Sequence, residues 1–100
     1  MHSNYLLTGG TGFLGKYIYD YLLSIGNHVV RLGRSSKNDI VCNLAKDIPV
    51  FEQNFDVVIH AAGKAHIQAF NKAIAKDFFD VNLQGTKNLC SAIDKCSKKP

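Results

Sequence analysis

The fold of this chain is decided by the stretch Thr8-Gly9-Gly10-Thr11-Gly12-Phe13-Leu14-Gly15. It follows an apolar run, Tyr5-Leu6-Leu7, and leads into an amphipathic run that continues to about Ile25. The G-x-x-G-x-x-G spacing allows a tight turn after a strand, a close backbone approach to a pyrophosphate and close packing of helix on strand. The N–H groups and the positive end of the new helix would face the phosphates. In this strand-to-helix context the stretch predicts a pyrophosphate-binding loop.

A second phosphate-binding motif overlaps these residues. Gly10 to Tyr17 nearly match G-x-x-x-x-G-K-[ST], in which a Ser or Thr hydroxyl holds Mg²⁺ after the lysine. Tyr17 occupies that position, and its longer reach does not suit the task. Phe13 and Leu14 are also better explained as the first core residues of a helix. A nucleotide triphosphatase is therefore disfavoured.

Composition places the chain among small globular proteins. A length of 100 residues allows one domain at most. The shares of hydrophobic residues, 46%, and of charged residues, 20%, are those of a globular protein. The net charge of +4 comes largely from lysines near the end, without the aromatic-interleaved basic stripe of nucleic-acid binders. No apolar run approaches the roughly 20 residues of a membrane span. We therefore expect neither a nucleic-acid nor a membrane partner.

Three cysteines, an odd number without C-x-x-C spacing, favour a reducing compartment and no metal site. We interpret Cys90 and Cys96 as small hydrophobic residues on a helix. The N-terminus shows no signal-peptide pattern, so we expect a cytoplasmic protein.

The hydrophobic periodicity predicts the order β-α-β-β-α. Strands are expected at 4–8, 28–32, 40–42 and 55–60, a first helix at about 12–24, and a turn at 33–39. Residues 43–54 could hold one broken helical turn. A long helical region follows residue 63, is broken around 70–76 and continues from about 76 to 97. The expected core face of the first helix consists of Phe13, Leu14, Tyr17, Ile18, Tyr21, Leu22 and Ile25. That of the second consists of Phe79, Val81, Leu83, Leu89, Cys90 and Ile93.

Right-handed crossovers put the strands in the order 3-2-1-4 with helices on both faces. The predicted fold class is α/β, a Rossmann-like, partial doubly wound parallel sheet. Strand four would be an open edge, which a homodimer could cover by edge-to-edge pairing.

Three segments together resemble the extended short-chain dehydrogenase/reductases, which include nucleotide-sugar epimerases and dehydratases. They are the glycine stretch, Ile59-His60-Ala61-Ala62-Gly63, and Val81-Asn82-Leu83-Gln84-Gly85-Thr86. The resemblance covers nearly all of residues 4–97 but only the front part of a family member. It implies that residues 1–100 are the N-terminal part of an NAD(P)-binding Rossmann domain. The implied cofactor-binding residues are Gly9, Thr11, Gly12, Phe13, Leu14, Gly15, Arg34, Ser35, Asn43, Leu44, Ala61, Ala62 and Gly63.

The end of the second strand indicates which dinucleotide binds. Aligned on the family, Gly33 stands where the NAD enzymes carry Asp, and Arg34 and Ser35 follow. An acidic residue there would bond the ribose 2′-OH of NAD, whereas an Arg accommodates the 2′-phosphate of NADP. We therefore expect NADP(H) rather than NAD(H). The side chain of Arg31 points to the opposite face of the expected strand from those of Val30 and Leu32. Arg31 could therefore equally be a residue of the sheet face and not a cofactor contact.

The resemblance also implies roles near the reacting end of the cofactor. Lys64 and His66 lie where sugar substrates approach the nicotinamide, and are possible substrate contacts. His60 is interpreted as a satisfied buried histidine rather than a base. Asn82 is expected behind the active site as a structural residue, and Gly85 is expected to permit close approach to the sheet.

The family's chemistry runs through a Tyr-x-x-x-Lys pair, and none of the four tyrosines is followed by Lys at that spacing. We therefore expect an N-terminal piece of a larger enzyme that alone binds at most a dinucleotide. The whole protein would be an epimerase, dehydratase or reductase that acts on a nucleotide sugar by reversible hydride transfer. The alternative is a non-catalytic NAD(P)-binding or redox-sensing module.

Overall fold

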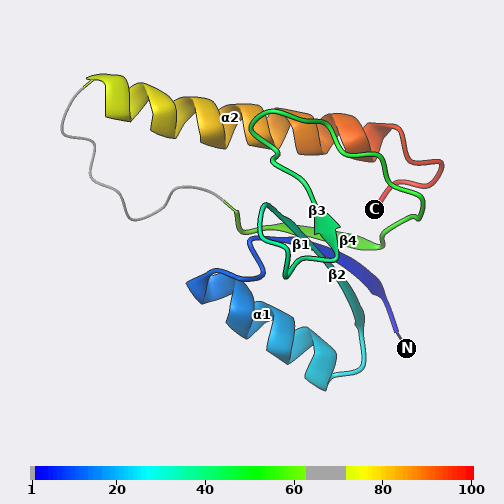
Figure 1. The fold of residues 1–100 in the computed structure, drawn as a ribbon. Helices are drawn as coiled ribbons and strands as arrows, with labels where there is room; N and C mark the ends of the chain where they lie inside the picture. The colour runs from blue at the N-terminus through cyan, green and yellow to red at the C-terminus, as the bar shows by residue number, and fades with distance from the viewer. Residues whose placement is uncertain (1, 63–71) are drawn as a thin grey trace.

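The computed structural model describes residues 2–62 and 72–100. Its elements are β1 (Asn4–Thr8), α1 (Phe13–Ser24), β2 (His28–Gly33), β3 (Ile40–Val41), β4 (Val57–His60) and α2 (Lys72–Asp94). All strand pairs are parallel, and the sheet order is β3-β2-β1-β4 (Figure 1). The predicted fold class and strand order are confirmed, and β4 forms one edge of the sheet.

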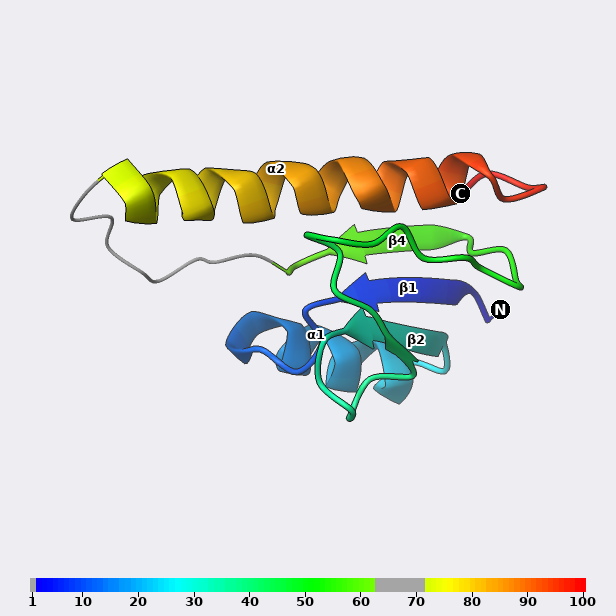
Figure 2. The same ribbon diagram turned by 45° about the horizontal axis from the view of Figure 1, so that its top comes forward.

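The molecule has three layers. Figure 2 shows α1 on one face of the sheet and α2 on the other. Alternate residues of β1 serve the two faces, as the pleat of a strand requires. Leu6 joins a core with residues of β2, of two loops and of α2, whereas its neighbour Leu7 packs beside Gly10 on the α1 face. The core cluster consists of Leu6, Leu32, Leu44, Phe55 and Leu89.

The predicted core face of α1 is wrong in most of its members. Only Leu22 and Gly15 are buried in this helix. Ile18 is half-buried. The other five predicted members, Phe13, Leu14, Tyr17, Tyr21 and Ile25, are 53–80% exposed. The periodicity identified residues that share a face, but among the described elements α1 packs mainly on β1 and β2, and five of the seven predicted residues of that face stay exposed.

The predicted face of α2 is partly wrong. Leu89 is buried and Ile93 packs on the core, but Leu83 and Cys90 are exposed. The buried positions are instead Gly85, Asn88, Leu89 and Ala92, which recur at the three- and four-residue spacing of one helical face. Asn88 is tolerated there because its Nδ2 donates to the Leu44 carbonyl at 2.6 Å. Cys90 therefore does not act as a small core residue. Phe79 lies outside the described side chains.

Three predicted boundaries also differ. The helix α2 runs from Lys72 to Asp94 without interruption, so the predicted break around 70–76 is wrong for residues 72–76, whereas residues 70 and 71 lie outside the described residues, and the helix ends before the predicted residue 97. Residues 43–54 hold one turn, at 44–46, which the Asp47 N–H closes by donating to the Asn43 carbonyl at 2.9 Å, so the expected helical turn is present but lies before Pro49. The strand β4 begins at Val57, although Phe55 is 3% exposed. Over the ranges that the structure describes, no helix is long and apolar enough to cross a bilayer.

Candidate functional site

A cavity of about 610 Å³ lies at the carboxyl edge of the sheet. It is bordered by the glycine loop after β1, the turn after β2, the loop after β3, the end of β4 and one side of α2. Because β2 and β4 lie on opposite sides of β1, the strand order reverses here. Ligands of open α/β sheets bind at such a switch point, and the volume is in the range of small-molecule sites.

The glycine loop can be built only from glycine at two positions. Gly9 has a φ of +74°, and a Cβ on it would lie 2.7 Å from the Ala61 carbonyl carbon and from the Ala62 nitrogen. A Cβ on Gly15 would lie 1.8 Å from the Gly9 oxygen. The loop is therefore folded tightly on itself and on the end of β4.

The first turn of α1 is open towards a ligand. Gly12 is the N-cap, no side chain caps the helix, and no acidic residue lies in its first turn. Backbone N–H groups of a first helical turn have no partner within the helix. Together with the positive end of the helix they favour an anion such as a phosphate.

The cavity brings together ten of the predicted site residues from five separate segments. Those that line it are Gly9, Thr11, Gly12, Arg34, Ser35, Asn43, Leu44, Ala61, Ala62 and Asn82. Phe13, Leu14 and Gly15 form the first turn of α1 without lining it. Gly63, Lys64 and His66 lie outside the described residues.

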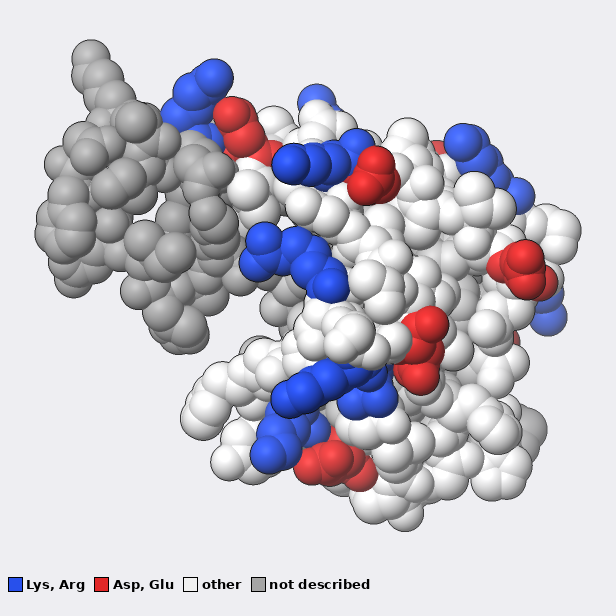
Figure 3. All heavy atoms as spheres, in the orientation of Figure 1, with Lys and Arg blue, Asp and Glu red and all other residues white. Residues whose placement is uncertain are grey.

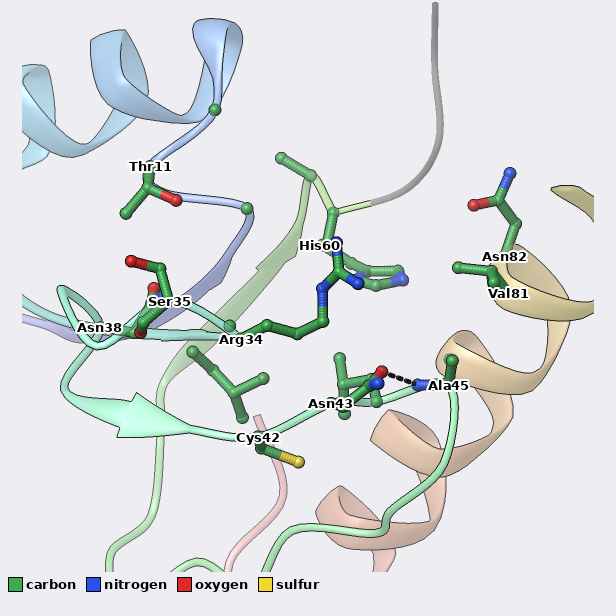
Figure 4. Close-up of a pocket in the computed structure, with 18 of the residues that line it drawn as sticks. Thr11, Arg34, Ser35, Asn38, Cys42, Asn43, Ala45, His60, Val81 and Asn82 are labelled. Atoms are coloured by element: carbon green, nitrogen blue, oxygen red, sulfur yellow. Dashed lines mark hydrogen bonds between the residues drawn. The ribbon is translucent and has the colours of Figure 1, made fainter. Parts of the chain in front are cut away.

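The electrostatics of the cavity favour an anionic ligand. Its lining contains two cationic side chains, Arg34 and Lys46, and no carboxylate among the described residues. Figure 3 shows Lys and Arg side chains above and below a hollow on the face in view. In Figure 4 the Arg34 side chain extends across the cavity towards His60, and Ser35 lies on the side of Thr11.

The sequence did not identify Asn38, which explains the absence of a side chain at position 33. Asn38 is 7% exposed, and its Nδ2 donates to the Ser35 carbonyl at 3.0 Å. A Cβ on Gly33 would lie 2.8 Å from that Nδ2. The amide therefore fills the space beside Gly33 and holds the turn that carries Arg34. An Asn five residues after a glycine carries no signal by itself.

Asn43 is already engaged in a local turn. Its Oδ1 accepts a hydrogen bond from the Ala45 N–H at 3.1 Å, the dashed line in Figure 4. The Nδ2 of this amide can donate a hydrogen bond to a ligand. Before it, Cys42 lines the same wall, and burial together with the nearby Asp47 charge raises the pKa of its thiol. Cys42 is therefore a neutral thiol at pH 7.

Arg31 is a sheet-face residue on the α1 side. Its guanidinium carbon lies 4.2 Å from the ring centroid of Tyr19, and its Nε lies 3.7 Å from Asp39 Oδ2. Its side chain also packs under Gly10, where a Cβ would lie 3.0 Å from the Arg31 Cγ. Arg31 supports the glycine loop from behind and does not line the cavity.

His60 lines the cavity with both ring nitrogens hydrogen-bonded. Its Nδ1 lies 2.5 Å from Thr8 Oγ1, and its Nε2 lies 3.2 Å from Thr86 Oγ1. It is satisfied, as predicted, but it is exposed on the cavity side rather than buried. Partial burial lowers the pKa of His60, so the neutral ring is favoured.

Two expectations for α2 have clear outcomes. Gly85 approaches the loop after β3 rather than the sheet, and a Cβ there would meet Leu44 Cβ at an ordinary 3.6 Å. Asn82 lines the cavity rather than lying behind it, and its carbonyl accepts a hydrogen bond from Thr86 Oγ1 at 2.8 Å. Among the residues described by the structure, no cluster of three His, Cys, Asp or Glu side chains could hold a metal ion.

Known proteins resemble the chain over almost its whole length. It is 34% identical to the sterol-4-alpha-carboxylate 3-dehydrogenase, decarboxylating, of Dictyostelium discoideum, over 89% of this chain and 31% of that protein. It is 32% identical to mouse 3 beta-hydroxysteroid dehydrogenase type 7, over 92% and 28%. The chain thus spans about a third of the length of the curated relatives it matches.

Two solved structures share its fold. The human epimerase family protein SDR39U1 (isoform 2) with NADPH superimposes with a TM-score of 0.76 at 24% identity, over 97% of this chain and 34% of that one. UDP-glucose-4-epimerase of Stenotrophomonas maltophila, with bound NAD and formylated UDP-arabinopyranose, gives 0.70 at 22% identity, over 93% and 34%. The profile of the NAD dependent epimerase/dehydratase family matches residues 5–100. The chain belongs to this NAD dependent epimerase/dehydratase family.

Proposed function

We propose that the cavity binds NADP(H) in preference to NAD(H). The observation that carries this proposal is the end of β2, where Gly33 and Arg34 border the cavity and no carboxylate of a described residue does. A carboxylate there would accept a hydrogen bond from the 2′-OH of NAD, whereas a guanidinium binds a 2′-phosphate in bidentate fashion. The Asn38 amide beside Gly33 leaves little room for a side chain at that position.

The residues present fit a dinucleotide. The glycine loop, without side chains on its inner surface, and the uncapped start of α1 suit the pyrophosphate. Arg34 and Ser35 suit the phosphate on the adenosine ribose, and Ala61 and Ala62 leave space across the end of β4. A bound nicotinamide dinucleotide would supply hydride transfer. The contribution of this chain would be to hold that cofactor.

For the whole protein we propose reversible hydride transfer at a carbon of a nucleotide sugar. Support comes from the family description and from the resemblance to nucleotide-sugar enzymes in three segments. The two relatives above 30% identity carry sterol and steroid names. Incubating the whole protein with NADP⁺ and either a UDP-hexose panel or a 3β-hydroxysterol tests the substrate class. Because epimerisation and dehydration return the hydride and leave no reduced cofactor, conversion of each UDP-hexose is followed by chromatography of the products, and sterol oxidation by cofactor reduction. Oxidation of the sterol without conversion of any UDP-hexose would refute the sugar assignment.

Calorimetric titration of the chain with NADPH and with NADH tests the cofactor preference. Charged hydrogen bonds contribute about 1.5–3 kcal/mol, so Arg34→Ala should weaken NADPH binding by about 10- to 150-fold and leave NADH nearly unchanged. Lys37→Ala is the matched control, because Lys37 is exposed in the same turn and does not line the cavity. Tighter binding of NADH than NADPH by the wild type would refute the preference. An equal effect of the Lys37 variant would reduce the role of Arg34 to general charge attraction.

A further inference from the structure

A chain of hydrogen bonds crosses the carboxyl edge of the sheet and runs through His60. The Ala62 N–H donates to Thr8 Oγ1 at 3.2 Å, and Thr8 Oγ1 lies 2.5 Å from His60 Nδ1. On the other side of the ring, His60 Nε2 lies 3.2 Å from Thr86 Oγ1, which lies 2.8 Å from the Asn82 carbonyl. One imidazole therefore joins β1, β4 and α2.

The direction of each bond follows from what its ends can do. The Asn82 carbonyl only accepts, so the Thr86 hydroxyl donates its one hydrogen there. Thr86 can then only accept from His60, so Nε2 carries the proton. At the other end the Ala62 N–H only donates, and the Thr8 hydroxyl is free to donate to an unprotonated Nδ1. The neutral Nε2–H tautomer satisfies every member of the chain.

This chain fixes the peptide between Ala61 and Ala62. Thr8 holds it through its hydroxyl, which accepts from the Ala62 N–H, and holds the preceding peptide through its carbonyl, which accepts from the Ala61 N–H at 3.1 Å. The Ala61–Ala62 peptide packs against Gly9, closer than any Cβ would allow. The position of the glycine loop relative to the Ala61–Ala62 peptide thus depends on the hydrogen bonds that His60 makes.

We propose that His60 is a positioning residue for the cofactor, and that only its neutral Nε2–H form keeps the Ala61–Ala62 peptide against Gly9 for dinucleotide binding. The inference rests on the proposed function. A protonated Nδ1 would face Thr8 Oγ1 as a second donor and turn the Thr8 hydroxyl hydrogen away from its acceptor. Thr8 is fully buried, so that hydrogen would be costly to leave unpaired.

Among the described residues, none around His60 would stabilise its charged form. The groups that face it from β1 and α2 are the hydroxyls of Thr8 and Thr86, which do not titrate. The charged residues that share its cavity are Arg34 and Lys46, both cations. Partial burial acts in the same direction, because it lowers the pKa of the ring. Acidification should therefore weaken dinucleotide binding.

Two measurements on the chain test this proposal. The first is the tautomer of His60 at pH 7.5 without ligand, from long-range ¹H–¹⁵N correlation spectra; Nε2–H is expected, and Nδ1–H or a charged ring would overturn it. The second is the affinity for NADH between pH 8 and pH 5. NADH is the probe because it lacks the 2′-phosphate monoester, which would itself titrate near pH 6.

The affinity for NADH should fall by up to tenfold per pH unit below the pKa of His60, because binding then requires the loss of one proton. His60→Asn keeps an acceptor towards Thr8 and lacks the link to Thr86. We expect it to bind about tenfold more weakly at pH 8 and to lose the pH dependence. His28→Asn should keep the wild-type profile, because His28 is exposed and does not line the cavity. Thr86→Val should weaken binding at pH 8, and Thr86→Ser should restore it.

The outcomes separate the two proposals. A pH profile that His60→Asn leaves unchanged, or that another histidine variant abolishes, overturns the role of His60 alone. If the wild type binds no dinucleotide at any pH, the proposed function fails and the positioning role fails with it. The Nε2–H tautomer would in that case remain a feature of the fold.

Discussion

The clearest perturbation is the same substitution, Gly to Ala, at two buried helical positions. Gly15 lies in the first turn of α1, and Gly85 lies in the middle of α2. Each replacement adds one methyl group and raises intrinsic helix propensity by about 0.8–1.0 kcal/mol. The two positions differ in what the new Cβ meets.

At Gly85 the nearest atoms to a Cβ belong to Leu44 and Ala45 and lie at 3.6, 3.9 and 4.0 Å. These are ordinary van der Waals distances, so the propensity gain should appear nearly in full. At Gly15 the nearest atoms are Gly9 O at 1.8 Å, Gly9 C at 2.6 Å and Gly10 Cα at 2.9 Å. All are backbone atoms, so the glycine loop itself must move. Overpacking typically costs about 1–3 kcal/mol, and a backbone obstacle puts this site at the upper end.

We expect Gly85→Ala to stabilise the chain by about 1 kcal/mol, which raises Tm by about 4–8 °C in a domain of this size. Gly15→Ala should destabilise it by about 2 kcal/mol after the propensity gain is subtracted, and should abolish measurable NADPH binding. Urea unfolding and calorimetric titration of both variants measure these quantities. Equal stabilities of the two variants, or wild-type NADPH affinity of Gly15→Ala, would refute the account of the loop.

Three further predictions concern pH, thiols and the exposed helix face. Because the pKa of His60 is lower in the folded chain than its ordinary value of 6.5, the unfolded state takes up the proton first. The free energy of unfolding should therefore fall as the pH drops below about 6.5, and His60→Asn should lose this part of the decline in urea melts at pH 8, 6.5 and 5. Iodoacetamide at pH 7.5 should modify the exposed Cys90 before Cys42, whose raised pKa keeps it a thiol; peptide mapping that finds Cys42 first contradicts this. Tyr17→Ser should change stability by no more than about 0.5 kcal/mol, whereas Leu22→Ala should cost about 2–5 kcal/mol, and similar losses for both would show that the face of α1 is covered.

The features that the sequence predicted correctly depend on the handedness of strand connections and on the conformation of single residues. The strand order follows from right-handed connections, and the turn at Gly9 follows from a backbone conformation that glycine adopts at no steric cost. The carboxyl ends of parallel strands meet at one edge, so residues 9, 34 and 61 converge on the cavity although they are far apart in the chain.

What the sequence did not predict depends on neighbours that no local pattern reveals. Periodicity placed Tyr17 and Leu22 on one face of α1, but only a tertiary contact decides that Leu22 alone is buried. The buried Asn88 breaks the apolar pattern of α2, and its partner is a carbonyl 44 residues earlier. The roles of Asn38 and of the hydrogen bonds of His60 likewise depend on residues that fold beside them.

The central claim is that the cavity at the carboxyl edge of the sheet is a dinucleotide site. An NMR titration of the ¹⁵N-labelled chain with NADPH tests it most directly, because it reports the stoichiometry and the place of binding together. The account predicts saturation at one NADPH per chain, with the largest amide shifts at Gly9–Gly12, Arg34–Ser35 and Ala61–Ala62. Saturable binding whose shifts lie away from these three segments, or no shifts at millimolar NADPH, would contradict it.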